Sequence, residues 1–426
     1  MPRGWAWSTL GEIGQYLNGR AFKKSEWSPT GRVIIRIQDL TGSGGSPNHF
    51  AGAVEPRYEV HRGDLLISWA ATLGAYLWDA DDAVLNQHIF KVSSFINPRF
   101  HFYLAQSVIA DLYRQAHGSG MVHVTKGTFE AVRVALPPLR EQARVVAAIE
   151  ERVSDLDASV AALESVRAQL PRYRAAVLRA ACEGRLVARG PQDWTQVTLG
   201  EVATDVSYGT SAKTTAELGV PVLRMGNIVD GRLSFNTLKY LPSSHHEFPW
   251  LLLAPGDILF NRTNSAELVG KTAVYGGLPT PCSFASYLIR IRVSDRCEPR
   301  YLSAYLNSLL GRTWIASVVS QQVGQANVSG GKLKSMPIRL PPLAEQRRIV
   351  DEIERRLSLA GALRQAVEAA IMRAARLRQA ILRSAFQGGL VPQDPSDEPA
   401  AALLARVRPG AARPRGSGHH AGGVAS

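Results

Sequence analysis

The sequence predicts an α+β protein in which two similar mixed α/β modules are each followed by a long helix, and the two helices pair as a coiled coil. Two observations predict this fold: the chain repeats itself after about 200 residues, and both copies carry a heptad pattern of apolar residues. A repeat of this length indicates two copies of one structural unit. The expected segments are a first module at 1–140, a first helix at 141–190, a second module at 191–344, a second helix at 345–394 and a tail at 395–426.

The repeat is clearest where each module ends. Leu-Pro-Pro-Leu-Arg-Glu-Gln at 136–142 returns as Leu-Pro-Pro-Leu-Ala-Glu-Gln at 340–346. Weaker matches in the same order are Leu-Gly-Glu at 10–12 and 199–201, Gly-Asp at 63–64 and 256–257, and Pro-Arg at 98–99 and 299–300. Matches that keep their order along both copies indicate an internal pseudo-two-fold repeat.

Each module mixes Gly, Pro, aromatic and β-branched residues with short apolar runs. Val-Ile-Ile-Arg-Ile at 33–37 and Tyr-Leu-Ile-Arg-Ile at 287–291 are bounded by turn residues, which is typical of short strands. The proline pairs at 137–138 and 341–342 cannot continue a strand ladder but suit the start of a helix. The sequence therefore predicts β-rich modules that pass directly into helices.

The segments after the prolines are rich in Ala, Glu, Arg and Leu, which is typical of long helices. Apolar residues spaced three and four apart form one stripe on each helix, and such stripes favour helix pairing. The residues predicted to pair are Ile149, Val153, Leu156, Val160, Ile353, Leu357, Val367 and Ile371. Arg364 interrupts the second stripe, and Pro171 predicts a kink or a break in the first helix. An alternative is that the two helices only cap a core.

The composition favours an anionic partner inside the cell. Forty-nine Lys and Arg against 36 Asp and Glu give a net charge of +13, and the pI is near 9.9. Three scattered cysteines are too few for a disulfide framework or a zinc site, which favours a reducing cytoplasm. No run approaches the ~18 apolar residues of a membrane span, so no membrane association is expected. The tail, rich in Ala, Gly, Pro and Arg, is predicted to be disordered.

The duplicated hinge and the helix endings carry a family resemblance. The first helix ends in Ala-Cys-Glu-Gly-Arg-Leu at 181–186, and the second ends in Ala-Phe-Gln-Gly-Gly-Leu at 385–390. With these endings the chain, from residue 1 to about 394, resembles the specificity (S) subunit of a Type I restriction–modification system. Cys182 departs from the family's aromatic residue at this place, which we expect to affect packing more than role.

The resemblance implies a DNA-recognition role without catalysis. In that family the two modules are target recognition domains, each reading one half of a split DNA sequence, and the two long helices pair antiparallel as a coiled coil that sets the spacer. The implied partners are double-stranded DNA, two methyltransferase (M) subunits and endonuclease/translocase (R) subunits. S-adenosylmethionine, ATP and Mg would belong to those partners, so this chain is expected to bind no cofactor. Because the two modules differ in sequence, the two half-sites should differ as well.

Candidate DNA-binding residues lie in predicted loops of both modules. Arg and Asn can make paired hydrogen bonds to guanine or adenine edges, and Lys suits phosphate. The candidates are Arg20, Lys23, Lys24, Arg36, Lys213, Arg224, Asn261, Arg262 and Gln325. Arg36 and Arg224 occupy equivalent places in the two copies, whereas Trp69 stands where Arg262 stands.

No catalytic or metal site is expected. The proline pairs belong to the hinges and not to a methyltransferase motif, and no glycine-rich loop for adenosylmethionine follows a strand. Gly270-Lys271-Thr272 ends like a phosphate-binding loop, but Ser265 replaces the glycine that such a loop requires. Two alternatives to the S subunit stay open: a stand-alone DNA-binding regulator and a coiled-coil interaction scaffold.

Overall fold

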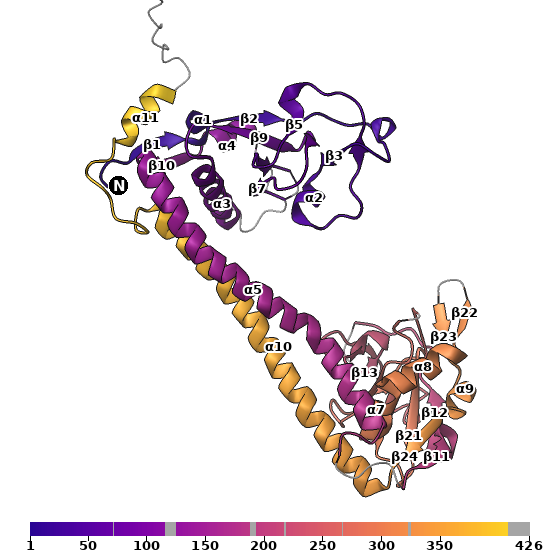
Figure 1. Cartoon of the computed structure of the whole chain (residues 1–426). Coiled ribbons are helices and arrows are strands. Elements are labelled where there is room, and N and C mark those ends of the chain that lie inside the picture. Colours follow the sequence, from indigo (N-terminus) through magenta and orange to yellow (C-terminus); the bar gives the residue numbers. More distant parts are fainter. Residues whose placement is uncertain are drawn as a thin grey trace, which may run out of the picture. The chain divides into compact units, whose positions relative to one another are not determined.

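The computed structural model describes residues 1–70, 72–115, 125–187, 193–216, 219–265, 267–322 and 325–407. The chain divides into two compact units, shown in Figure 1: unit 1 is Met1–Ala162 with Ala370–Ser426, and unit 2 is Leu163–Ala369. Each unit holds one module together with part of both long helices. Among the described residues, none of the helices is long and apolar enough to cross a membrane.

The module of unit 1 is built on two four-stranded sheets and one short ladder. The first sheet, entirely antiparallel, has the order β2 (Gly14–Asn18), β9 (Ile89–Ser94), β6 (Leu65–Ser68), β7 (Gly74–Leu77). The second has the order β4 (His49–Phe50), β3 (Arg32–Ile35), β8 (Ala83–Leu85), β5 (Glu59–Val60), with β3 and β8 parallel. The ladder pairs β1 (Ala6–Thr9) with β10 (Arg133–Leu136). The helical elements are α1 (Leu10–Ile13), η1 (Lys24–Glu26), α2 (Ile37–Thr41), η2 (Pro56–Tyr58), α3 (Pro98–Gln115) and α4 (Lys126–Glu130).

The module of unit 2 repeats this plan. Its four-stranded antiparallel sheet has the order β12 (Ala203–Tyr208), β21 (Leu288–Val293), β17 (Ile258–Asn261), β19 (Thr272–Val274). The other sheets are β16 (Lys239–Leu241), β13 (Val220–Leu223), β20 (Ser283–Phe284); β11 (Thr195–Thr198), β24 (Pro337–Leu340); β14 (Ile228–Val229), β15 (Arg232–Leu233); and β18 (Thr263–Asn264), β23 (Gln325–Asn327), β22 (Ser320–Gln322). The helical elements are α6 (Leu199–Val202), η3 (Met225–Asn227), α7 (Pro299–Asn307), α8 (Leu309–Val318) and α9 (Gly330–Lys334). The parallel pair β13–β20 matches the parallel pair β3–β8, so the predicted repeat is confirmed at the level of topology.

The Glu-Gln pair of each hinge joins a module to its helix. In unit 1 the indole of Trp5 donates to Glu141 at 3.0 Å. The side chain of Gln142, fully buried, accepts from the backbone N–H of Asn97 at 3.0 Å and donates to the carbonyl of Pro137 at 3.0 Å. A buried amide that bonds two separate backbone segments holds them in one arrangement.

Unit 2 repeats these contacts one by one. Trp194 donates to Glu345 at 3.1 Å, and Gln346 accepts from the N–H of Glu298 at 2.7 Å and donates to the carbonyl of Pro341 at 2.8 Å. The strongest sequence match between the copies is therefore explained by structure: Glu and Gln attach the module to the first turn of the helix.

The two long helices are α5 (Leu139–Cys182) and α10 (Leu343–Phe386), each 44 residues. In unit 1 the beginning of α5, with Ile149 and Val153, shares a core with Leu382 near the end of α10. In unit 2 the end of α5, with Val177, shares a core with Ile353 near the beginning of α10. Each beginning meets the other helix's end, so the predicted antiparallel pairing is confirmed.

The stripe residues differ in burial along the helices. Ile149, Val153, Ile353 and Val367 are buried, whereas Leu156, Val160, Leu357 and Ile371 are half-buried. The stripes around Ile149 and Ile353 lie in different units, and each packs on a module core as well as on the other helix. Pairing and capping, which the sequence presented as alternatives, are thus combined.

Two expectations about the helical segments are corrected. The helix α5 continues through Pro171, so the expected break is wrong, and the kink that was its alternative stays a prediction. The disordered tail predicted from residue 395 is wrong for residues 395–407, because α11 (Ala400–Val407) packs Leu403 and Leu404 into the core of unit 1. Asp397, whose side chain is 1% exposed, pairs with Arg144 of α5 at 2.7 Å. Residues 408–426 lie outside the described part of the chain.

Candidate nucleic-acid interface

In the module of unit 2, four loops meet at one end of the β12-β21-β17-β19 sheet. The loop after β12 is joined to the segment before β21 by one hydrogen bond, in which the backbone N–H of Ser286 donates to the carbonyl of Thr210 at 2.8 Å. The backbone N–H of Arg262, directly after β17, donates to Tyr287 at 3.0 Å, and its carbonyl accepts from Val328 at 3.0 Å. The sheet therefore gathers loops that are far apart in sequence onto one surface.

Arg262 is held in place on this surface. Its guanidinium carbon lies 4.6 Å from the centre of the Tyr208 ring, and Nη2 donates to Asn327 at 3.4 Å. Its Nε is buried without a hydrogen-bond partner among the described residues. An oriented guanidinium with an unused donor is suited to a hydrogen bond with an anionic or carbonyl group.

The equivalent position of unit 1 is built from different side chains. Trp69 donates to Asn18 at 3.0 Å and stacks on Phe90 with ring centres 5.8 Å apart. Asn18 and Tyr208 end equivalent strands, β2 and β12, so Trp69–Asn18 corresponds to Arg262–Tyr208. The two modules present different chemistry at the same place.

Arg36 and Arg224 also occupy equivalent turns. The backbone N–H of Arg36 donates to Asp39 at 2.9 Å, and that of Arg224 donates to Asn227 at 2.9 Å. The Arg36 guanidinium faces its own Asp39 at 3.5 Å, whereas the Nε of Arg224 is buried without a partner among the described residues. Arg224 is the less neutralised of the two.

The remaining candidates differ in whether their side chains are paired within the module or exposed. Arg20 pairs with Glu26 at 2.7 Å and lies 4.0 Å over the Phe22 ring, so its charge is used within the module. Backbone and side-chain hydrogen bonds, from Lys23 and Arg20, lower the pKa of Glu26. Lys23, Lys24 and Lys213 are exposed. Gln325 lies in β23, and its side chain is outside the described part of the structure.

The structure adds residues that the sequence reasoning missed. A pocket of about 580 Å³ in unit 2, called here the Asn261 pocket, is lined by two of the candidates, Arg224 and Asn261, and by Lys271 and Tyr287. Lys271 belongs to the Gly-Lys-Thr that only resembles a phosphate loop, and Tyr287 was part of a predicted strand. The signal that could have found Tyr287 is its place in the turn directly before the apolar run that starts at Leu288, because loops often carry function.

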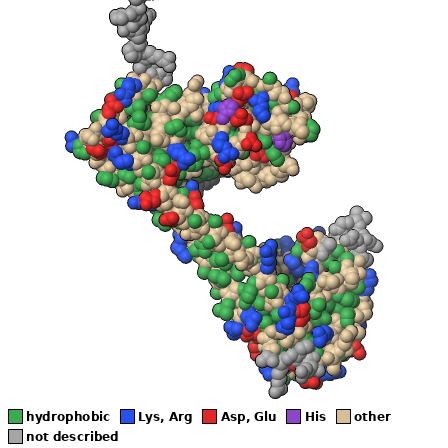
Figure 2. All heavy atoms as spheres, viewed as in Figure 1, with side chains coloured by type: hydrophobic (Ala, Val, Ile, Leu, Met, Phe, Trp, Pro, Cys, Tyr) green, Lys and Arg blue, Asp and Glu red, His purple; other side chains and the backbone are tan. Residues whose placement is uncertain are grey.

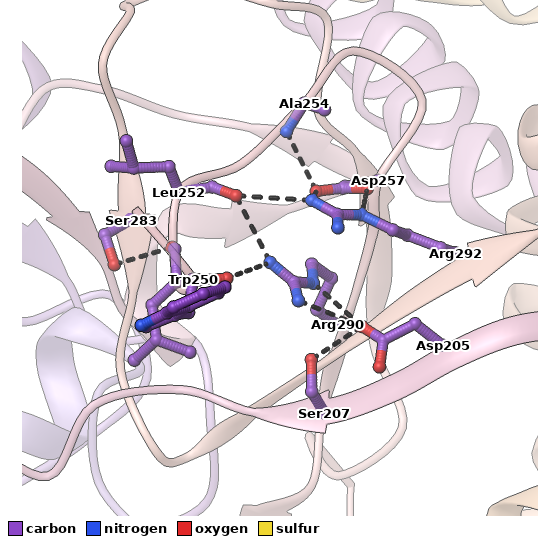
Figure 3. Close-up of polar contacts among 10 residues, drawn as sticks. Asp205, Ser207, Trp250, Leu252, Ala254, Asp257, Ser283, Arg290 and Arg292 are labelled. Atoms are coloured by element: carbon purple, nitrogen blue, oxygen red, sulfur yellow. Dashed lines mark hydrogen bonds and ion pairs between the residues drawn. The ribbon is translucent and has the colours of Figure 1, made fainter. Parts of the chain in front are cut away.

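Other basic residues are structural. Arg290 pairs with Asp205 at 2.9 Å and donates to the carbonyls of Trp250 and Leu252, while Arg292 pairs with Asp257 at 2.8 Å (Figure 3). The hydrogen bond to Asp257 raises the pKa of Arg292. These contacts hold the loop before β17 against β21.

Unit 1 contains one ion pair at the place where unit 2 has two. Lys91 pairs with Asp64 at 2.7 Å and donates to the carbonyl of Glu59 at 2.7 Å. The repeated Gly-Asp of the two modules is therefore a structural feature. On the face drawn in Figure 2, Lys and Arg are spread among Asp and Glu over both units and do not form one block.

The repeat found in the structure coincides with a family of known sequences. The family model of the Type I restriction modification DNA specificity domain matches residues 2–170 and again residues 191–369. This chain belongs to that family. Each match contains one module and much of the helix that follows it, so the specificity domain occurs twice.

Individual relatives support the same assignment over most of the chain. The EcoBI specificity subunit of Escherichia coli is 25% identical over 95% of this chain and 92% of its own length. The EcoKI specificity subunit of Escherichia coli strain K12 is 28% identical over 72% of this chain and 71% of its own length. The chain is thus similar to Type I specificity subunits in both modules and both helices.

Solved structures have the same fold. A chain from a structure of complex assembly in a type I R-M system matches with a TM-score of 0.69 and 24% identity, over 91% of this chain and 99% of its own. The HsdS subunit of Thermoanaerobacter tengcongensis matches with a TM-score of 0.51 and 25% identity, over 91% of this chain and 98% of its own. Two modules on paired long helices are therefore the shared architecture.

Proposed function

We propose that this chain is the DNA sequence-recognition subunit of a Type I restriction–modification complex, and that each module reads one half of an asymmetric, bipartite double-stranded target. The observation that carries the proposal is the DNA specificity domain present twice in one chain. Two reading modules require two half-sites. The difference between Trp69 and Arg262 at equivalent loops supports two different half-site sequences.

The proposed protein partners are two methyltransferase subunits that bind the long helices, together with endonuclease/translocase subunits. The helices carry large apolar side chains that are exposed: Tyr173, Leu359, Leu363, Met372 and Leu377. In unit 2 some of them line an apolar groove of about 290 Å³ between α5 and α10. Exposed apolar surface of this kind is typical of protein–protein contacts. Methyl donor, ATP and Mg would be bound by these partners, and this chain would bind DNA without catalysing a reaction.

The test is a methylome. Modified bases are sequenced in cells that express this chain with the methyltransferase encoded beside it, and in cells that lack only this chain. We expect a split adenine motif that disappears with the deletion. In the intact complex, Arg262→Ala should lower the preference for the correct base in one half of the motif by a factor of about 10–100. The reason is that a good bidentate contact contributes about 1–3 kcal/mol of discrimination between bases.

Arg406→Ala is the matched control, because Arg406 is exposed on α11, outside the loops of both modules and outside the long helices, and pairs with Glu398. Its motif should equal that of the wild type. Equal methylomes with and without expressed chain would contradict the proposal and favour a regulator or a scaffold.

A further inference from the structure

A short turn comes directly before a central strand of the main antiparallel sheet in each module. In unit 1 the turn is Asn-Gln-His at 86–88, which leads into β9, and in unit 2 it is Ala-Ser-Tyr at 285–287, which leads into β21. The first residue of each turn forms a parallel bridge with the loop that follows the neighbouring strand, β2 or β12. The two turns are therefore equivalent parts of the repeat.

The backbone of the first turn is fixed from several sides. The N–H of Ile89 donates to the carbonyl of Asn86 at 3.2 Å and closes the turn, and the N–H of Trp69 donates to the carbonyl of His88 at 3.3 Å. Gly19 lies so close to the turn that a Cβ on it would meet the carbonyl of Asn86. The turn thus has one backbone arrangement, which does not depend on the side chains that it carries.

Unit 2 holds its turn in the same way. The N–H of Leu288 donates to the carbonyl of Ala285 at 2.9 Å, and the N–H of Arg262 donates to the carbonyl of Tyr287 at 3.0 Å. Gly209 takes the place of Gly19, since a Cβ on it would meet the carbonyl of Ala285. The same backbone with different side chains is suited to reading different bases in the two half-sites.

The side chains of the turns are available to a ligand although their backbone is fixed. Gln87 and His88 are exposed, and Tyr287 is 49% exposed, whereas Ser286 is half-buried. Exposed side chains on a loop that a rigid scaffold positions are typical of binding sites. Each turn therefore presents at least one large polar side chain on the surface where the loops of its module meet.

The amide of Gln87 is oriented and still has unused hydrogen-bonding groups. Its nitrogen donates to Nε2 of His88 at 3.1 Å, and the His88 ring meets the Trp69 ring edge-on, with ring centres 5.6 Å apart. The amide oxygen of Gln87 has no hydrogen-bond partner among the described residues. Since a glutamine amide has two N–H donors and one carbonyl acceptor, one N–H and the oxygen remain for a ligand.

A donor beside an acceptor matches the edge of adenine in the major groove, where N7 accepts and the N6 amino group donates. Phosphates, by contrast, are bound chiefly by Lys and Arg, so a neutral amide is better suited to a base. The charge of Arg20 is already paired with Glu26 at 2.7 Å. Gln87 is therefore the residue of the first module that is best suited to reading a base.

We propose that the turns at 86–88 and 285–287 read base pairs in the two half-sites, and that Gln87 makes two hydrogen bonds to an adenine that stays stacked in the duplex. The free N–H of Gln87 donates to N7, and its oxygen accepts from N6, while His88 acts as a positioning residue through its bond to the amide. In unit 2 Tyr287 contacts a base of the other half-site. The proposal rests on the DNA-recognition function proposed above and deepens it by naming residues that determine specificity.

The experiment uses the full-length chain in complex with its methyltransferase and duplexes based on the motif found in the methylome. Each position of both half-sites carries the four base pairs in turn, and the dissociation constant is measured for every duplex. Gln87→Ala should lower the preference for adenine at one position by a factor of about 10 or more, because it removes a bidentate contact. The preferences at the other positions should stay. Tyr287→Ala should lower a preference in the other half-site only.

A second variant of Gln87 separates base reading from a loss of folding. In Gln87→Glu the carboxylate accepts from N4 of cytosine but cannot donate to N7 of adenine, so the preferred base at the same position should change from adenine to cytosine. A damaged module would not acquire a new preference. Gln15→Glu is the matched control, because Gln15 is exposed near the beginning of β2, away from Gly19, and the variant adds the same charge to the same module. It should keep the preference for adenine.

The possible failures are distinguishable. Unchanged preferences in Gln87→Ala and Gln87→Glu would overturn base reading by this turn and leave the recognition function intact. An equal loss of affinity for all duplexes in Gln87→Ala would also overturn it, because such a loss indicates a contact to the DNA backbone. Effects of Gln87 and Tyr287 in the same half-site would contradict the equivalence of the two turns. Absence of specific binding of the wild-type complex to any duplex would refute the recognition function itself.

Discussion

At the scale of single residues, the two modules solve the same packing problem with different chemistry. His101 in α3 is fully buried between the hydroxyls of Tyr16 and Ser94, at 2.8 Å and 2.9 Å. The equivalent residue of α7 is Leu302, which follows the same Pro-Arg-aromatic sequence and is also fully buried. A polar cluster in one copy thus replaces an apolar contact in the other.

His101 gives unit 1 a pH dependence. Burial disfavours the imidazolium and lowers the pKa of His101 to about 3, against about 6.5 when unfolded. Below pH 6.5 the unfolded chain binds a proton that the folded chain does not, so stability falls as pH falls, by about 2 kcal/mol at pH 5 from this residue. Hydrogen exchange of β2 and α3 at pH 7 and pH 5 measures the loss.

The matched variant is Tyr16→Val with His101→Leu, which copies Val206 and Leu302 of the second module. Between pH 7 and pH 5, the free energy of unfolding of unit 1 should fall by about 2 kcal/mol less in this variant than in the wild type. An identical pH dependence in both proteins would show that His101 titrates normally in the folded state.

At the scale of elements, burial along the helices decides which stripe positions matter. Ile353 is 6% exposed in the core of unit 2, whereas Leu359, further along α10, is 60% exposed. We expect Ile353→Asp to destabilise unit 2 by more than about 3 kcal/mol, because it buries an unpaired charge. Leu359→Asp is the control and should change stability by less than about 0.5 kcal/mol. Urea unfolding of both variants tests the difference, and equal effects would contradict the packing.

Leu156 shows the limit of reasoning from periodicity. Its heptad position equals that of Ala360, and the stripe predicts that a charged residue at Leu156 or at Ile353 disrupts assembly of the helices. The structure leaves Leu156 half-buried, so a smaller loss is expected. The spacing of a stripe gives the face that is buried, and the neighbouring elements decide how deeply.

At the scale of the whole molecule, the length of the paired helices is proposed to set the gap between half-sites. One extra heptad in both α5 and α10 adds about 10.5 Å to each helix. Since duplex DNA rises about 3.4 Å per base pair, the methylated motif should gain a gap of about 3 base pairs. Methylome sequencing measures the change. A heptad inserted in α5 alone should abolish methylation, because it shifts the register in which the two helices pair. An unchanged gap with the double insertion would refute the proposal that helix length sets the gap.

Much of this architecture could be predicted because the features that indicate it lie close together in the sequence. The repeated hinge, the heptad stripes and the family resemblance depend on residues close in sequence, and all three appear in the structure. The role of the hinge Glu and Gln was not predictable, because their partners Trp194 and Glu298 lie about 150 and 50 residues away.

Periodicity and motif spacing predict the duplicated fold and the pairing of the helices, and the motifs carry the family resemblance that implies an antiparallel pair, because these features are local properties of the chain. Three features appear only in the folded chain: α11 packs on unit 1, Arg20 is neutralised by Glu26, and Asn261 and Lys271 share a pocket. Burial and the pairing of polar atoms depend on which distant segments come together. Those contacts, and not the residue types alone, determine which of the many polar side chains are left with an unused hydrogen bond.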